Sequence, residues 1–220
     1  MDRPLLKDTP LMKALSAVEE PQPTPMEAFK VARRMWAQCK HISIGELAHA
    51  VGVSRVTLYR WVGSREKLVD EILWSYTKPT FEKAIKSAPG TGVDHILETH
   101  RRFMTDLARF EPMRRFLIDN PFEAIRIQTN DPSCSHGRLI QAVEAQLIEQ
   151  EKLGYIELPD VAAKIAELIV FTNGALVYCA ILGGRDTEAV IEQACMIDRS
   201  LLAGQFESKN RRGISARKKK

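Results

Sequence analysis

Hydrophobic residues recur at intervals of three and four positions along most of the chain, which is the spacing of one face of an α-helix. No segment alternates between hydrophobic and polar residues for long enough to indicate a strand, and the sequence contains no internal repeat. The sequence therefore predicts an all-α fold. The expected helices cover residues 25–38, 44–51, 55–62 and 65–87, followed by 93–108, 112–119, 122–128, 136–152, 160–182 and 187–204.

Prolines and glycines interrupt these patterns and divide the chain into four parts. Residues 1–23 are rich in proline and are expected to form a disordered arm with a short helix near 11–18. The segment APGTG at 88–92 is the expected boundary between a small domain at 24–87 and a larger one at 88–205. Residues 206–220 form a basic tail for which two interpretations stay open, a solvated disordered end and a DNA-contacting arm.

Hydroxyl side chains precede the expected helices of the small domain, where they can accept hydrogen bonds from the backbone N–H groups of a first turn. Thr24 precedes Pro25, a residue that suits the first helical position. Ser43 has Glu46 three residues later, which is the spacing of a capping box. Gly52 follows the second helix, where a left-handed backbone costs glycine little. Further N-caps are expected at Ser54 and Ser64.

The segment from 42 to 68, ISIGELAHAVGVSRVTLYRWVGSREKL, predicts two short helices joined by a glycine-containing turn. The second of them can bury Leu58, Trp61 and Val62, which follow one another at helical spacing. Its opposite face then presents groups suited to guanine edges, to a thymine methyl and to phosphates. We therefore predict a helix-turn-helix whose second helix enters the major groove of double-stranded DNA. The outward residues are Arg55, Val56, Tyr59 and Arg60.

The same segment resembles the DNA-binding domain of the TetR family of transcription regulators. The matching stretches are ELA at 46–48, GVS at 52–54, TLYR at 57–60 and GSREKL at 63–68. The resemblance implies that Thr57 and Tyr59 hold phosphates and that residues just after the turn read bases or phosphates. It also implies backbone contacts from Arg65, at the start of the following helix, and from Ser43. The complete set of expected DNA-binding residues is Ser43, Ser54, Arg55, Val56, Thr57, Tyr59, Arg60 and Arg65.

Two departures from the family pattern predict a divergent branch. Family members usually carry an aromatic residue where Val62 stands. The spacing from Trp36 to Ala48 is also shorter than usual. Within the family, the chain is similar to the QsdR-type regulators of lactone breakdown.

The distribution of charge agrees with a nucleic-acid-binding unit at the N-terminal side. Residues 24–87 hold 11 Lys or Arg against 6 Asp or Glu, whereas residues 88–205 hold 11 against 17. The tail at 206–220 holds 7 against 1. A basic unit joined to an acidic body suits a module that binds phosphates and a body that does not.

In the TetR family, the last two long helices pair with those of a second copy, and the helices before them surround a cavity for an inducer. The resemblance implies a homodimer built on 160–182 and 187–204. The first of these segments is apolar on all sides, so the helix must be buried on more than one side. Dimer contact, cavity wall and plain core all stay open for each of its residues.

A ligand cavity needs mostly apolar walls with a few polar groups. For Asn173 and Tyr178, hydrogen bonding within the core is the alternative interpretation. The expected ligand is a small apolar inducer, with lactones as one candidate class. The candidate lining residues are Phe103, Met104, Met113, Phe116, Phe122, Ile125, Phe171, Asn173 and Tyr178.

Signatures of catalysis are missing from the sequence, which has no H-E-x-x-H, P-loop, G-x-S-x-G or G-x-G-x-x-G motif. His95 with Glu98, and Cys134 with His136, are weak metal hints because each lacks a full ligand set. We therefore expect no enzymatic activity, no cofactor and no metal.

The four cysteines are dispersed without a C-x-x-C pair, which fits a reducing, cytoplasmic compartment. The first 25 residues lack the apolar core of a signal peptide. The longest uncharged apolar run, 168–184, is short for a membrane span and favours a buried helix.

The sequence thus predicts a dimeric transcription regulator, a repressor that a small-molecule inducer releases from a near-palindromic operator. Two alternatives stay open. One is a DNA-binding regulator without a small-molecule ligand. The other is a helical scaffold for protein interactions whose basic motif is incidental.

Overall fold

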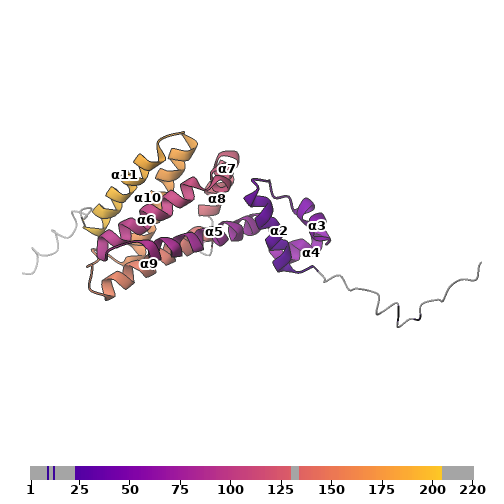
Figure 1. Ribbon diagram of the computed structural model, residues 1–220, viewed down its shortest axis with the longest axis horizontal. Helices are drawn as coiled ribbons and strands as arrows, with labels where there is room; N and C mark the ends of the chain where they lie inside the picture. The colour runs from indigo at the N-terminus through magenta and orange to yellow at the C-terminus, as the bar shows by residue number, and fades with distance from the viewer. Residues whose placement is uncertain (1–8, 10–11, 13–22, 130–133, 205–220) are drawn as a thin grey trace, which may run out of the picture.

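The computed structural model describes residues 9, 12, 23–129 and 134–204, and over these residues it is helical without a strand (Figure 1). The predicted all-α fold is confirmed. The predicted N-terminal arm, apart from residues 9, 12 and 23, and the predicted basic tail lie outside the described residues. The helices are α2 (Pro25–Ala37), α3 (Ile44–Val51), α4 (Arg55–Val62), α5 (Arg65–Ser87), α6 (Gly92–Arg109), α7 (Glu111–Asp119), α8 (Pro121–Thr129), α9 (Ser135–Lys152), α10 (Ala162–Leu182) and α11 (Thr187–Leu202).

The observed helices follow the predicted ones closely, and the largest differences fall at the ends of the last two. Helix α10 begins at Ala162 rather than 160, after Val161 as N-cap. Helix α11 ends at Leu202 because the chain turns at Gly204, which has a φ of 68°. Such a left-handed conformation suits glycine just past a helix end.

The predicted caps of the small unit form at each helix start. Thr24 and Glu27 make the reciprocal bonds of a capping box, with Pro25 in the first turn. Ser43 accepts from the backbone N–H of Glu46, which is one half of the box predicted there. Ser54 and Ser64 cap α4 and α5 in the same way, each by accepting from the N–H three residues later. Local capping therefore fixes where each helix begins.

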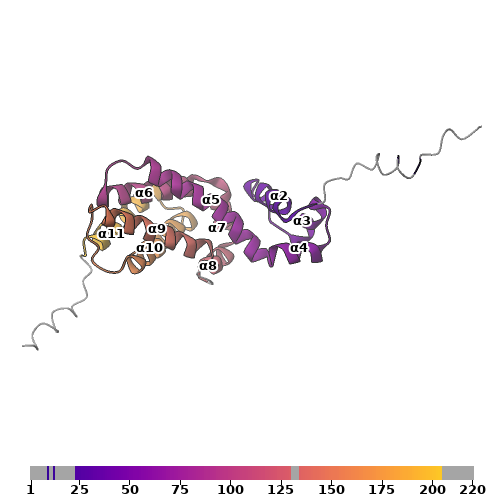
Figure 2. The same ribbon diagram turned by 90° about the horizontal axis from the view of Figure 1, so that it is seen from below.

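Helices α2, α3 and α4 form a small unit at one end of an elongated molecule (Figures 1 and 2). Helix α5 begins beside this unit and runs into the larger helical body, so it connects the two parts (Figure 2). In the body, α10 packs against α9 and α11, while α6 packs against α5 and α11. A long shared helix of this kind can carry a change in the body to the small unit.

Helix α10 is long and apolar enough to cross a membrane, judged by length and composition. In this structure it packs between α9 and α11, and residues such as Ile165, Ile169 and Val177 are buried in the common core. Burial of this kind agrees with the sequence-based interpretation of α10 as a helix of the protein core.

Candidate DNA interface and ligand cavity

The outward face of α4 carries the side chains predicted to meet DNA. Leu58 is fully buried against the rest of the unit, while Arg55, Val56, Tyr59 and Arg60 are exposed. Val56 leaves 78% of its surface open to solvent, so this face also offers an apolar group. Burial of one side of α4 therefore leaves a mixed basic, aromatic and apolar face free for a major groove.

The start of α4 is suited to phosphate. Ser54 Oγ accepts from the Thr57 N–H at 3.0 Å and lies 2.9 Å from the Thr57 hydroxyl. The first turn contains no acidic residue, so its backbone N–H groups keep their partial positive charge. A hydroxyl has a donor and two acceptor sites, so Ser54 can cap the helix, Thr57 can bond to Ser54, and both hydroxyls can still contact a phosphate.

The guanidinium of Arg55 lies against the backbone of α3 at Gly45. A Cβ placed on Gly45 would come within 2.7 Å of Arg55 Nη2 and 3.1 Å of Cζ. The missing side chain at Gly45 therefore provides the space that the guanidinium occupies. The sequence analysis did not single out this glycine.

Replacing Gly45 with alanine should raise the free energy of unfolding by up to about 1 kcal/mol, because alanine is the better helix residue. The same change should displace the Arg55 guanidinium and alter base preference at the positions it reads. Urea unfolding and binding to a panel of duplexes measure the two effects. Gly52→Ala is the control, since a φ of 77° makes that change destabilising. An unaltered base preference in Gly45→Ala would contradict the role of this contact.

Arg65 joins the small unit to the body. Its Nε donates to the backbone carbonyl of Ile42 at 2.7 Å, and one terminal nitrogen lies 3.2 Å from His41 Nε2. The other terminal nitrogen forms an ion pair with Glu123 on α8. Arg65 was expected to contact phosphate, but its guanidinium is engaged within the chain. A phosphate would have to replace one of these partners.

The start of α9 is fastened to the same region of α5. Ser135 donates to Asp70 Oδ1 through its hydroxyl at 2.6 Å and through its backbone N–H at 2.9 Å. Arg138 donates to Glu71 at 2.5 Å. Helix α8 and the start of α9 are thus both attached to the first turns of α5, next to the DNA-binding unit.

Helices α5 to α10 line a mostly apolar cavity of about 110 Å³ that is partly open to the surface. Ala124 is the contribution of α8 to its wall, and Ser135 and His136 come from the start of α9. The cavity therefore adjoins the segments that are fastened to α5. Of the predicted ligand-binding residues, those that line it are Phe103, Met104, Met113, Phe116, Asn173 and Tyr178.

Three predicted lining residues lie elsewhere, and these placements correct the sequence-based assignment. Phe122 and Ile125 on α8 point to solvent, and Phe122 leaves 84% of its surface exposed. Phe171 on α10 is also largely exposed, with its ring 4.9 Å from that of His136. Successive residues of a helix differ in direction by about 100°. Phe171 is therefore turned away from the side of α10 on which Asn173 faces the cavity.

A buried polar group lies at one end of the cavity. Asp198 on α11 is fully buried, and its Oδ2 accepts from His100 Nδ1 at 2.8 Å and from Asn173 Nδ2 at 2.9 Å. Sequence analysis missed His100 and Asp198. A signal for both was available, because each occupies a position on the apolar face of its helix.

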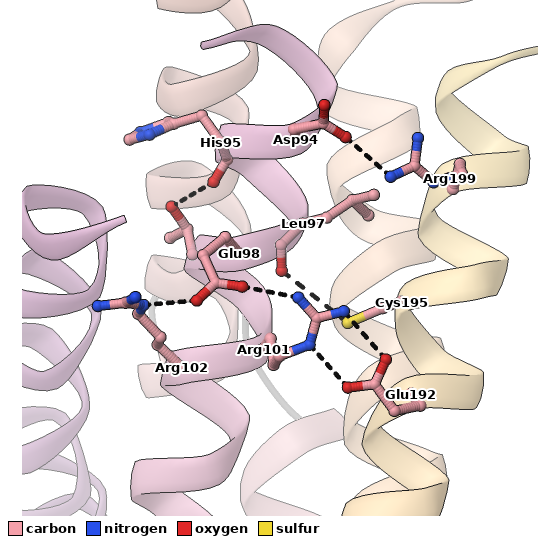
Figure 3. A network of polar contacts seen from close by, with 10 residues as sticks. Asp94, His95, Leu97, Glu98, Arg101, Arg102, Glu192, Cys195 and Arg199 are labelled. Atoms are coloured by element: carbon pink, nitrogen blue, oxygen red, sulfur yellow. Dashed lines mark hydrogen bonds and ion pairs between the residues drawn. The ribbon is translucent and has the colours of Figure 1, made fainter. Parts of the chain in front are cut away.

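Helices α6 and α11 are also joined by ion pairs at their surface (Figure 3). Arg101 contacts Glu192 at 2.7 Å and Glu98 at 2.7 Å, and Arg199 contacts Asp94 at 2.8 Å. Hydrogen bonds from Arg102 and Arg101 hold the pKa of the Glu98 carboxyl below its usual range, and a hydrogen bond from Arg101 lowers the pKa of Glu192. Glu98, one of the weak metal hints, is therefore paired with arginine. No group of three or more potential metal ligands occurs among the described residues.

A stripe of apolar and small residues on α10 remains exposed. Leu168, Phe171, Ala175, Cys179 and Leu182 recur at helical spacing along one face. Helix α11, which packs against α10, adds exposed residues at helical spacing, Ala189, Gln193 and Met196. We call these two stripes the α10–α11 face. Exposed apolar residues grouped on one face commonly mark a protein interface.

The small unit is a helix-turn-helix with an exposed second helix, and the body contains a cavity. Together they define a DNA-binding protein with a separate helical domain. Residues 91–203 match the family described as the C-terminal domain of tetracyclin repressor-like proteins. The chain belongs to the TetR family of transcriptional regulators, as the sequence motifs predicted. Members of this family are regulators and not enzymes.

Solved structures share the fold. The transcriptional repressor QsdR of R. erythropolis, of the TetR family, is 26% identical with a TM-score of 0.73; the match covers 81% of this chain and 94% of QsdR. The fatty acid degradation regulator FadR of Bacillus halodurans is 15% identical with a TM-score of 0.55, over 84% and 98%. A protein of Rhodococcus sp. RHA1 with unknown function is 16% identical with a TM-score of 0.55, over 84% and 100%. No curated protein sequence is similar enough to count as a match.

Proposed function

We propose that this protein is a homodimeric repressor that leaves a near-palindromic operator when a small apolar molecule enters its cavity. The outward face of α4 is the observation that carries the DNA-binding part of the proposal. The mostly apolar cavity supports the ligand-binding part. The similarity to QsdR, a transcriptional repressor, supports repression rather than activation. A cytoplasmic location agrees with this proposal, because an operator-binding protein acts where the DNA is.

The α10–α11 face supports a homodimer. Most soluble oligomers use a two-fold axis, which buries the same surface on both copies. Pairing of this face would cover side chains such as Leu168 and Met196 that are otherwise exposed. Two α4 helices related by that axis would read two half-sites about one helical turn apart.

The contact between Arg65 and Glu123 suggests how the cavity and the DNA interface communicate. Glu123 holds Arg65, and its neighbour Ala124 lines the cavity. A ligand that fills the cavity would stabilise the position of α8 in which Glu123 retains Arg65. DNA would stabilise the alternative, in which Arg65 turns to a phosphate. Arg65 then has two states, one held by Glu123 and one bound to phosphate. The ligand favours the first state and DNA favours the second.

Replacing Glu123 with glutamine should strengthen operator binding by about fivefold, because the amide competes less well than a carboxylate for Arg65. Fluorescence anisotropy on a selected duplex measures the affinity. Glu66→Gln is the matched control, since it removes the same charge from the neighbouring first turn of α5. The gain should also vanish in an Arg65→Ala background. An equal gain with and without Arg65 would show that the carboxylate acts through its charge alone.

Substitutions on α4 test the assignment of the DNA interface. Tyr59→Phe should weaken binding to all duplexes, because the expected phosphate contact carries no sequence information. Arg55→Ala should weaken binding and also relax base preference, since a guanidinium that reads guanine contributes about 1–3 kcal/mol of discrimination. Anisotropy with matched and mismatched duplexes separates the two effects. Unchanged affinity in both variants would overturn the assignment.

A further inference from the structure

The polar end of the cavity presents two unsatisfied atoms to its interior. His100 and Asn173 line the cavity and are 2% and 8% exposed. Within the described residues, His100 Nε2 and Asn173 Oδ1 are buried without a hydrogen-bond partner, as are Asp198 Oδ1 and, in another part of the cavity wall, His136 Nε2. Buried polar atoms are rarely left unpaired, because the lost bond to water is not replaced. His100 Nε2 and Asn173 Oδ1 therefore call for a partner that is not part of the chain.

Asp198 fixes the orientation of both side chains. Its carboxylate can only accept hydrogen bonds, so Asn173 must turn its NH₂ group toward Asp198 and its carbonyl oxygen away. The same reasoning puts a proton on His100 Nδ1. Asp198 is not part of the cavity wall, whereas His100 and Asn173 are. The free ends of these two side chains are therefore the ends that reach the cavity.

The hydrogen bonds to Asp198 determine what the polar end offers. A fully buried carboxylate is costly unless hydrogen bonds compensate it, and His100 and Asn173 both donate to Asp198. Asn173 Oδ1 is then left as a hydrogen-bond acceptor without a donor. Burial lowers the pKa of His136, another wall residue, so it adds no positive charge near neutral pH. No Lys, Arg, Asp or Glu belongs to the described cavity wall.

We propose that this cavity selects a small neutral molecule whose polar group carries a hydrogen-bond donor, as an amide or an alcohol does. The inference rests on the proposed function, since it specifies the ligand of the same cavity. A carboxylate would bring a second negative charge close to Asp198 and offers no donor to Asn173. A simple ester or lactone also has no donor and leaves Asn173 Oδ1 unpaired. A lactone that also bears a hydroxyl or amide N–H fits the requirement.

The size of the cavity sets the size of the probes. Its volume of about 110 Å³ is comparable with engineered apolar cavities of about 150 Å³ that accept benzene. Six-carbon compounds that differ in the polar group alone are therefore suitable. The set is hexanamide, 1-hexanol, hexanoate and γ-caprolactone.

Titration of the full-length chain with each compound, by calorimetry and ligand-observed NMR, tests the proposal. Hexanamide and 1-hexanol should bind at least about tenfold more tightly than hexanoate and γ-caprolactone, because each of the latter leaves a buried group unpaired. Asn173→Leu should reduce the preference for hexanamide over γ-caprolactone to about one. Gln146→Met is the control: Gln146 is buried and bonds Thr99, but it does not line the cavity.

The outcomes separate this inference from the proposed function. Equal or tighter binding of hexanoate or γ-caprolactone overturns the ligand class and leaves an inducer cavity in place. Absence of binding by all four compounds at millimolar concentration overturns the ligand class and removes the support for an inducer cavity. Operator binding by the same preparation, measured without any compound, tests the DNA-binding function independently. A preference that Gln146→Met abolishes as fully as Asn173→Leu would also contradict the proposal.

Discussion

Replacing Asp198 with alanine should lower the free energy of unfolding by about 3 kcal/mol or more. The carboxylate is fully buried and is bonded to both His100 and Asn173. Its removal leaves a buried imidazole and a buried amide without their common partner. Urea unfolding at a fixed protein concentration measures the loss, and the concentration is fixed because the proposed dimerisation would contribute to stability.

Asp94→Ala is the matched control for this change. Asp94 also links α6 with α11, through Arg199, but both side chains are mostly exposed. Exposed ion pairs contribute little, so the loss should be less than about 1 kcal/mol. Similar losses in the two variants would contradict the view that the buried group at the cavity end holds α6, α10 and α11 together.

Placing a charge on the α10–α11 face by Leu168→Glu should convert the dimer to a monomer and weaken operator binding at least about a hundredfold. Two linked half-site contacts bind far more tightly than one, because the second contact is made at a high effective concentration. A buried carboxylate without a partner in the interface is costly enough to separate the copies. Analytical ultracentrifugation gives the oligomeric state, and anisotropy gives the affinity.

Ile118→Glu on α7 is the matched control, because Ile118 is exposed to a similar degree but lies outside the α10–α11 face. This variant should remain dimeric with unchanged operator affinity. A native chain that sediments as a monomer, or a Leu168→Glu variant that stays dimeric, would contradict the proposed interface.

Features that depend on local sequence could be predicted well. Caps such as Ser54 and Ser64 act on their own helix, and Gly52 adopts the predicted left-handed turn, so the limits of α3, α4 and α5 follow from neighbouring residues. The exposed face of α4 follows from the burial of Leu58 by the same logic. Local sequence was sufficient here, because each helix limit and the exposed face of α4 depend on residues within about one helical turn.

Features that depend on how the helices pack against one another could not be predicted from the sequence. Helix α10 is apolar on all sides, so periodicity does not distinguish the cavity side from the exposed side that carries Phe171. The prediction that Phe122 lines the cavity was wrong for a related reason. A short helix with apolar residues on two sides has no unique inward face. Burial on more than one side removes the periodic signal that assigns a face.

Contacts between residues far apart in the chain could not be predicted from the sequence either. The ion pair of Arg65 with Glu123 and the bond of His100 with Asp198 both join separate helices. No local rule pairs such residues, although a charged group on an apolar helix face indicates that some buried partner exists. The two contacts that carry the proposed coupling and the proposed ligand class are therefore known from the structure alone.

Selection of bound duplexes from a random DNA library by the purified chain, at about 0.15 M salt, tests the central claim most directly. The proposed function predicts a near-palindromic motif with half-sites about one helical turn apart. Binding that is blind to sequence and disappears as salt is raised, or no binding at all, would contradict a sequence-specific dimeric regulator.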